Sequence, residues 1–113
     1  MKTFAEHWNG ARWSVVTTPS PNAQAELFSV SCPTAGNCYA VGNSSTPTTT
    51  KTLVEHWDGT RWSIVTSPNP TGAAAASLNE VSCSTTSSCV AVGYSSTTFL
   101  GFGTTLVERL MGR

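Results

Sequence analysis

Charge is scarce in this chain of 113 residues, because only 11% are Asp, Glu, Lys or Arg and six cations balance six anions. Nucleic acids and anionic membranes recruit proteins through a basic patch, so we expect neither as a partner. No apolar run approaches the roughly 20 residues that a membrane-spanning helix needs. Residues 1–7 also lack the apolar core of a signal peptide, so we expect an export signal only in a longer parent protein.

Helix formers are scarce as well. Four consecutive alanines at 73–76 form the one cluster, which is too short for a stable helix. Elsewhere, short runs rich in Val, Ile, Trp, Phe and Thr are separated by Gly, Pro, Asn and Ser. The first group favours strands and the second favours turns. The composition therefore predicts an all-β chain with almost no helix.

A repeat organises the sequence that is present. Four segments recur at distances of 49 to 53 residues, a period that indicates a repeat architecture. The recurring segments are EHWNGARWSVVTTPSP at 6–21 with EHWDGTRWSIVTSPNP at 55–70, VSC at 30–32 and 81–83, CYAVG at 38–42 with CVAVG at 89–93, and TLVE at 52–55 and 105–108. Nearly the whole chain is thus built from copies of one unit.

Each unit contains four strand-like runs, which makes nine predicted strands in all. The predicted first strands are 27–32 and 78–83, the second strands 39–43 and 90–94, the third strands 4–8, 52–57 and 105–109, and the fourth strands 12–17 and 61–66. Asn9-Gly10 and Asp58-Gly59 join third to fourth strands and favour tight hairpins. Prolines then end each fourth strand, because proline lacks the amide donor of a strand.

The change in repeat distance shows where insertions are tolerated. The later unit has extra residues in the connection between the fourth and first strands and in that between the second and third strands. In a meander, these two connections lie at the same end of the sheet. The connections at the opposite end keep their length. Because binding surfaces usually occupy variable loops on a rigid scaffold, we expect ligand-facing residues at the variable end. The candidates are Ser44, Thr46, Thr48, Thr97 and Phe99.

The order of these motifs resembles a known family. Ala-Val-Gly on one strand, then LVEHWDGTRW at 53–62 and a Pro-rich exit, is similar to the kelch-type β-propeller blade. The pattern Val-Ser-Cys-x5-Cys-x-Ala-Val-Gly is closer still to Trp-rich, Cys-paired propeller-like repeats of secreted bacterial proteins. The resemblance runs from Phe4 to Glu108.

The resemblance implies an all-β partial propeller of about two four-stranded antiparallel blades, occupying 1–113 as one domain. The expected parts are a half blade at 4–21, a full blade at 22–70 and an incomplete blade at 71–109. A propeller closes with four to eight blades. We therefore expect either a fragment of a longer parent or a marginally stable chain that self-associates to complete the propeller.

The four cysteines form two pairs of identical spacing, Cys32 with Cys38 and Cys83 with Cys89. Zinc sites prefer two to four residues between cysteines, and nothing between these cysteines ligates well. Each pair brackets a short connection between antiparallel strands, so we predict the disulfides Cys32–Cys38 and Cys83–Cys89. Disulfides indicate an oxidising compartment, which predicts an extracellular parent protein.

No residue pattern carries a catalytic signature. Glu55 precedes His56, yet adjacent strand residues point to opposite faces, so they cannot form a dyad. Trp57 and Trp62 flank the Asp-Gly turn, where packing across the hairpin is a simpler role than sugar stacking. We expect no catalytic, cofactor-binding or metal-binding residues.

Three functions remain open from the sequence. The first is a non-enzymatic extracellular module that binds a glycan or a protein through its variable loops. The second is a fragment of a propeller hydrolase of the sialidase or glycosidase kind, for which Glu26 and Glu80 are the only acids near a strand that leads to the propeller axis. The third is a purely structural repeat without a ligand.

Overall fold

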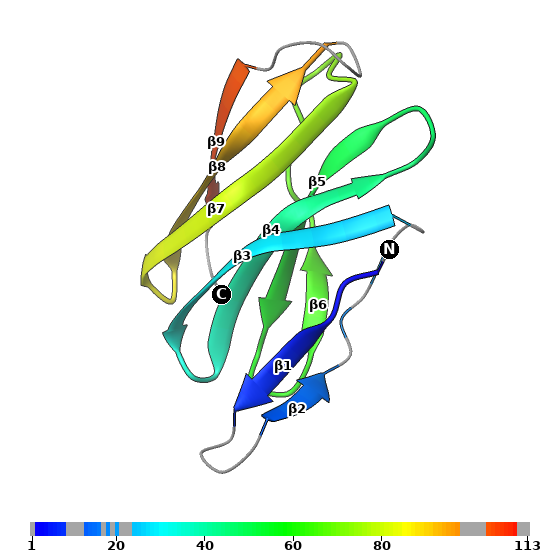
Figure 1. The fold of residues 1–113 in the computed structure, drawn as a ribbon. Helices are drawn as coiled ribbons and strands as arrows, with labels where there is room; N and C mark the ends of the chain where they lie inside the picture. Colours follow the sequence, from blue (N-terminus) through cyan, green and yellow to red (C-terminus); the bar gives the residue numbers. More distant parts are fainter. Residues whose placement is uncertain are drawn as a thin grey trace.

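The computed structural model describes residues 2–8, 13–16, 18, 20, 24–97 and 104–110. These residues form nine strands and no helix, which confirms the all-β prediction (Figure 1). The strands are β1 (Ala5–Trp8), β2 (Trp13–Val16), β3 (Gln24–Thr34), β4 (Asn37–Ser45), β5 (Thr50–Trp57), β6 (Trp62–Val65), β7 (Ala75–Thr85), β8 (Ser88–Ser96) and β9 (Thr104–Leu110).

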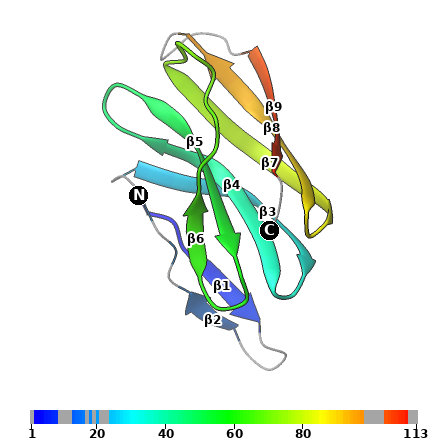
Figure 2. The same cartoon turned by 180° about the vertical axis from the view of Figure 1, so that it is seen from behind.

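The strands follow the predicted meander order. β3, β4, β5 and β6 pair antiparallel in sequence order, and β7, β8 and β9 do the same. We call these two units the first and second meander. A single parallel bridge, Thr50 with Ala75, joins them into one open, mixed sheet of seven strands. β1 and β2 form a separate two-stranded sheet beside the first meander (Figures 1 and 2).

Strand ends differ from the sequence-based ranges in a regular way. β3 and β7 begin earlier than expected, and Ala75 and Ala76 are the first residues of β7. β2 and β6 are short, with four residues each. Pro68 and Pro70 follow β6 after Thr66 and Ser67, and Pro19 and Pro21 follow β2 in the sequence. Neither strand can continue through these prolines, which lack the amide donor of a strand.

A glycine in each unit permits a close crossing of two strands. β3 and β7 each carry a register shift, after Leu27 and after Leu78, opposite Gly42 and Gly93. A Cβ at Gly42 would overlap the carbonyl oxygen of Glu26, and a Cβ at Gly93 would overlap that of Ser77. The glycine of each Ala-Val-Gly motif is therefore needed because a bulged neighbouring strand lies against it.

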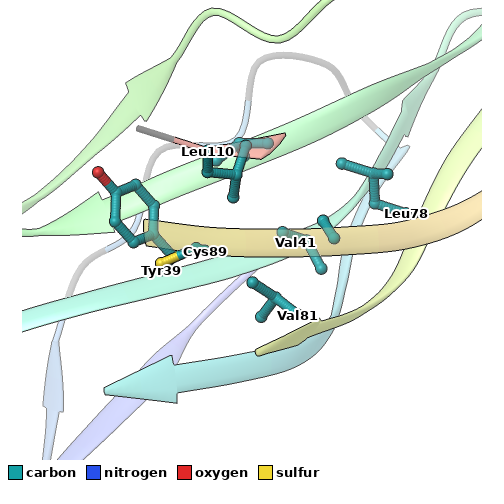
Figure 3. Close-up of a cluster of buried hydrophobic side chains, with 8 residues drawn as sticks. Tyr39, Val41, Leu78, Val81, Cys89 and Leu110 are labelled. Carbon is teal, nitrogen blue, oxygen red and sulfur yellow. The ribbon is translucent and has the colours of Figure 1, made fainter. Parts of the chain in front are cut away.

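The main hydrophobic core lies between the two meanders (Figure 3). Tyr39, Val41 and Val54 project from the first meander, and the second contributes the other members, which are Leu78, Val81, Cys89, Ala91 and Leu110. Alternate residues of a strand share one face, so the intervening positions of β4 point the other way. The face of β4 and β5 that carries Tyr39, Val41 and Val54 thus packs against the second meander.

The connection between β5 and β6 is a four-residue turn. The backbone N–H of Asp58 donates to the Arg61 carbonyl at 3.2 Å, and the Asp58 carboxylate accepts from the N–H groups of Thr60 and Arg61. Gly59 has a φ of 97°, a conformation that glycine adopts without strain. The bond from the Arg61 N–H, and then that from the Thr60 N–H, hold the pKa of Asp58 below its usual value.

Candidate functional site

The disulfides close the hairpins at the constant-length end, as predicted. Cys32 bonds Cys38 and Cys83 bonds Cys89, with Cα atoms 4.0 Å apart in each pair. Each bridge spans the two strands that lead into one turn. The cysteines are therefore structural cross-links, and none is free to act as a nucleophile.

Three of the four variable connections, those between β4 and β5, β6 and β7, and β8 and β9, lie together at Ala74. The Thr50 N–H donates to the Ala74 carbonyl at 3.1 Å, and the Ala74 N–H donates to the Ser96 carbonyl at 2.8 Å. Ala74 precedes β7, Thr50 begins β5 and Ser96 ends β8. The sequence-based inference that these connections share one end is thus confirmed, and we call this end the variable end (Figure 1).

The Pro-rich segment after β6 is fixed to the start of β5. Thr52 donates its N–H to Asn69 Oδ1 at 3.0 Å, and its hydroxyl lies 2.6 Å from that of Ser67. The preceding unit repeats the arrangement, with Thr3 N–H donating to Ser20 Oγ at 3.0 Å. Because the same contact occurs in both units, we interpret it as structural support for the variable end.

The predicted ligand-facing residues occupy different environments. Thr46, Thr48 and Thr97 are exposed at the variable end. Ser44 is buried, and it lies within β4, where it pairs with Ala25 of β3 and Lys51 of β5. Phe99 lies outside the described residues. The Thr46 hydroxyl accepts from the Thr49 N–H at 3.2 Å and thereby stabilises its own turn.

A hollow of about 490 Å³ lies near the variable end, between the two meanders. We call it the polar hollow, and its lining residues are Glu26, Phe28, Asn43, Ser77, Asn79 and Tyr94. The Asn43 amide donates to Ser77 Oγ at 3.0 Å, and Ser77 Oγ donates to Asn79 Oδ1 at 3.1 Å. Amide, hydroxyl and carboxylate groups therefore lie beside the half-exposed rings of Phe28 and Tyr94.

The polar hollow consists of three repeat positions, each represented twice. Residues 26 and 77, 28 and 79, and 43 and 94 are 51 positions apart, and every one of these pairs has two different residue types. Sequence reasoning named Glu26 but missed the other five. Divergence within an otherwise repeated unit was the available signal, because a packing role tends to preserve the residue type.

Two further glutamates, Glu55 and Glu108, have buried carboxyl groups. Among the described residues, neither carboxylate oxygen of Glu55 or Glu108 has a hydrogen-bond partner. Burial raises the pKa of Glu55 to about 7 and also raises the pKa of Glu108. A raised pKa is a property of general acids, but neither residue lines the polar hollow. Both occupy one repeat position, which favours a structural role.

His56 and the tryptophans also have structural contacts. The His56 ring lies 4.6 Å from the Tyr39 ring and forms a 3.1 Å hydrogen bond with Asn37 Oδ1. Glu55 pairs with Ala40 and His56 with Tyr39, so the acid and the imidazole lie on opposite faces as expected. The rings of Trp57 and Trp62 lie 5.9 Å apart across β5 and β6, which confirms the predicted cross-strand pair.

Carboxylates do not converge in the polar hollow. Glu26 is the only carboxylate among its described lining residues, and Glu80 is not part of it. Glycosidases use two carboxylates that flank the scissile bond. Nor do three His, Cys, Asp or Glu side chains come together as a metal site anywhere in the described ranges.

The described part of the chain contains no helix that is long and apolar enough to span a membrane. Comparisons of the chain with protein-family models, with curated proteins and with solved structures gave no match.

Proposed function

We propose that this chain is a non-enzymatic extracellular module of the propeller type that binds a glycan at its variable end. The two disulfides indicate an oxidising, non-cytoplasmic environment. The meander order of β3 to β6, and the face-to-face packing of this unit on β7 to β9, support the propeller interpretation.

The observation that carries the proposal is the chemistry of the polar hollow. Glycans present many hydroxyl groups, which pair with amide, hydroxyl and carboxylate side chains such as Asn79, Ser77 and Glu26. They also present apolar C–H faces, which pack on aromatic rings such as Phe28 and Tyr94. Small-molecule sites combine aromatic walls with a few placed polar groups in this way.

Binding of a protein remains the alternative for the same end of the molecule. The exposed Thr46, Thr48 and Thr97 offer hydroxyl groups around the loops rather than within the hollow. A protein partner would contact these loops over a broad area, whereas a glycan would depend on the hollow. The two proposals therefore predict different sets of sensitive residues.

The test is a glycan array screened with the intact chain, followed by calorimetry on any glycan that binds. We expect Tyr94→Ala to weaken binding by about tenfold, with unchanged thermal unfolding. Asn79→Ala should weaken binding to a similar extent and should also lower the unfolding temperature, because Asn79 Oδ1 accepts a hydrogen bond from the buried Ser77 Oγ. Thr86→Ala, at the constant-length end, should leave the affinity unchanged. A blank array, or a bound glycan that is indifferent to both hollow variants, would reject the glycan proposal. A protein captured through Thr48 and Thr97 instead would support the alternative.

A further inference from the structure

β8 presents an exposed apolar face whose repeat equivalent on β4 is buried. Val92 is 43% exposed, whereas Val41, its counterpart 51 residues earlier, is fully buried. Val90 is likewise exposed where Tyr39 is buried. We call Val90, Val92 and Tyr94 the β8 face. The β4 face is buried by the second meander, and among the described residues no equivalent unit covers the β8 face.

An apolar groove of about 580 Å³ lies between β1 and the first meander. Five of its lining residues are the repeat equivalents of core residues in the second meander. Leu27, Val30, Cys38, Ala40 and Trp57 correspond to Leu78, Val81, Cys89, Ala91 and Leu110. Val30 is 57% exposed, but Val81 is only 8% exposed because the β4 face packs against it. The groove is thus the open counterpart of the surface that receives β4.

We propose that the β8 face of one copy docks in the groove of a second copy of this chain. The docking repeats a contact that already exists within the molecule, between β4 and the second meander. Val41 and Val81 belong to one buried cluster there (Figure 3), so the repeat places Val92 of one copy against Val30 of the second copy. A second copy is the partner because both surfaces are versions of one internal interface.

A hydrogen bond has its counterpart in the same arrangement. Within the chain, Ser31 Oγ accepts from the backbone N–H of Cys83 at 3.2 Å. In the proposed docking, Ser82 of one copy takes the place of Ser31, its repeat equivalent, and Cys32 of the second copy takes the place of Cys83. Ser82 is exposed on β7 and is the same residue type as Ser31. The docked copies therefore align the Ser82 hydroxyl with the Cys32 N–H.

Docking requires one rearrangement. β9 of the docking copy and β1 of the receiving copy are both third strands of the repeat, and both would occupy the same place beside the groove. β1 must therefore move out of this place. β1 pairs only with β2 among the described strands, and the two form a sheet of their own. Moving this hairpin leaves every strand pair of the two meanders intact.

The interface is head-to-tail, because the groove and the β8 face are different surfaces of each copy. Such contacts form a closed ring when the rotation closes and a filament when it does not. A single substitution can therefore disable one surface and leave the other intact, and the experiment uses one such variant for each surface. Tyr94 belongs to both surfaces, but neither Val92 nor Val30 lines the polar hollow, so substitutions at Val92 and Val30 test docking without removing a glycan contact.

The experiment is sedimentation of the intact, disulfide-bonded chain over a range of concentrations. We expect the unmodified chain to associate, and Val92→Glu and Val30→Glu each to weaken association by at least about tenfold. An equimolar mixture of the two variants should form dimers, because one retains the groove and the other retains the β8 face. Thr86→Glu adds the same charge at an exposed turn and should associate as the unmodified chain does.

A monomeric unmodified chain would overturn the proposal, and so would a mixture of variants that stays monomeric. Association that persists equally in Val92→Glu and Val30→Glu would also overturn it. Circular dichroism checks that each variant is folded. If a glutamate variant unfolds, Val92→Thr and Val30→Thr replace it, because threonine has nearly the shape of valine. Each threonine variant is expected to associate more weakly than the unmodified chain.

Discussion

Ser31 accepts a hydrogen bond from the backbone of Cys83 across the two meanders, with Oγ and N 3.2 Å apart. Ser29 accepts an equivalent bond from the Val81 N–H, also at 3.2 Å. β3 and β7 are not neighbours in the sheet, so these side chains supply bonds that strand pairing does not. They fix the two meanders in one relative position.

We therefore expect Ser31→Ala to destabilise the chain. The substitution removes the acceptor of the Cys83 N–H, and a partly buried donor left without a partner costs about 1–2 kcal/mol. Urea unfolding followed by tryptophan fluorescence would measure the loss. Ser63→Ala is the control, since Ser63 is an exposed serine on β6. Equal destabilisation by both substitutions would show that the inter-meander bond is unimportant.

Gly42 gives a second prediction. Any side chain at Gly42 would overlap the Glu26 carbonyl, so Gly42→Ala must displace β3 and is expected to cost about 2–3 kcal/mol. Gly93→Ala should behave alike, because the Ser77 carbonyl lies equally close. In contrast, Gly36→Ala meets no atom within 4 Å and should be nearly neutral. A thermal melt of the three variants compares them, and a neutral Gly42→Ala would contradict the close crossing.

The sequence was sufficient for those features that each unit contains within itself. Strand order, the bond between Cys32 and Cys38, and the cross-strand pair of Trp57 and Trp62 depend on local periodicity and turn chemistry. The opposite orientations of Glu55 and His56 follow from the alternation of side chains along any strand. These interactions connect residues that are near one another in the sequence or in one hairpin.

Features between units could not be predicted. The polar hollow combines Phe28 of one meander with Tyr94 of the other, and their approach depends on how the two units pack. Gly42 was noticed as part of a motif, but its contact with the Glu26 carbonyl arises from a bulge that has no sequence signal of its own. Ser44 was expected near the ligand-facing loops, whereas it lies within β4 and is buried.

The disulfides give a third prediction, on stability under reducing conditions. The chain between Cys32 and Cys38 is short, with a sequence separation of 6. Closing so small a loop is expected to contribute about 2 kcal/mol through the entropy of the unfolded chain. Replacing both Cys83 and Cys89 by Ser should cost more than this amount, because Cys89 is buried in the core and a serine hydroxyl there is desolvated. Dithiothreitol should lower the stability of the unmodified chain by the contributions of both disulfides. A midpoint of urea unfolding that is insensitive to dithiothreitol would contradict this expectation.

Glu55 gives the last prediction, a loss of stability as the pH rises. Its side chain is fully buried, neither oxygen has a hydrogen-bond partner among the described residues, and burial raises its pKa from 4.5 to about 7. The folded state therefore binds the proton more tightly than the unfolded state does. Stability is highest below about pH 4.5, falls between pH 4.5 and 7, and is constant above that range as far as Glu55 is concerned. The full change is up to about 3 kcal/mol, and Glu108, whose pKa is also raised, acts in the same direction.

Glu55→Gln removes the titrating group at this position while keeping its shape. We expect the variant to lose stability less steeply than the unmodified chain between pH 4.5 and 7 in urea unfolding. Its advantage should appear at pH 8 and shrink at pH 4, because the unmodified carboxyl is neutral at the lower pH. Glu6→Gln is the control, since Glu6 occupies the same repeat position on β1 but is exposed. If Glu55→Gln and the unmodified chain show parallel stability profiles over this range, the buried Glu55 carboxyl is ionised at little cost, and the raised pKa is wrong.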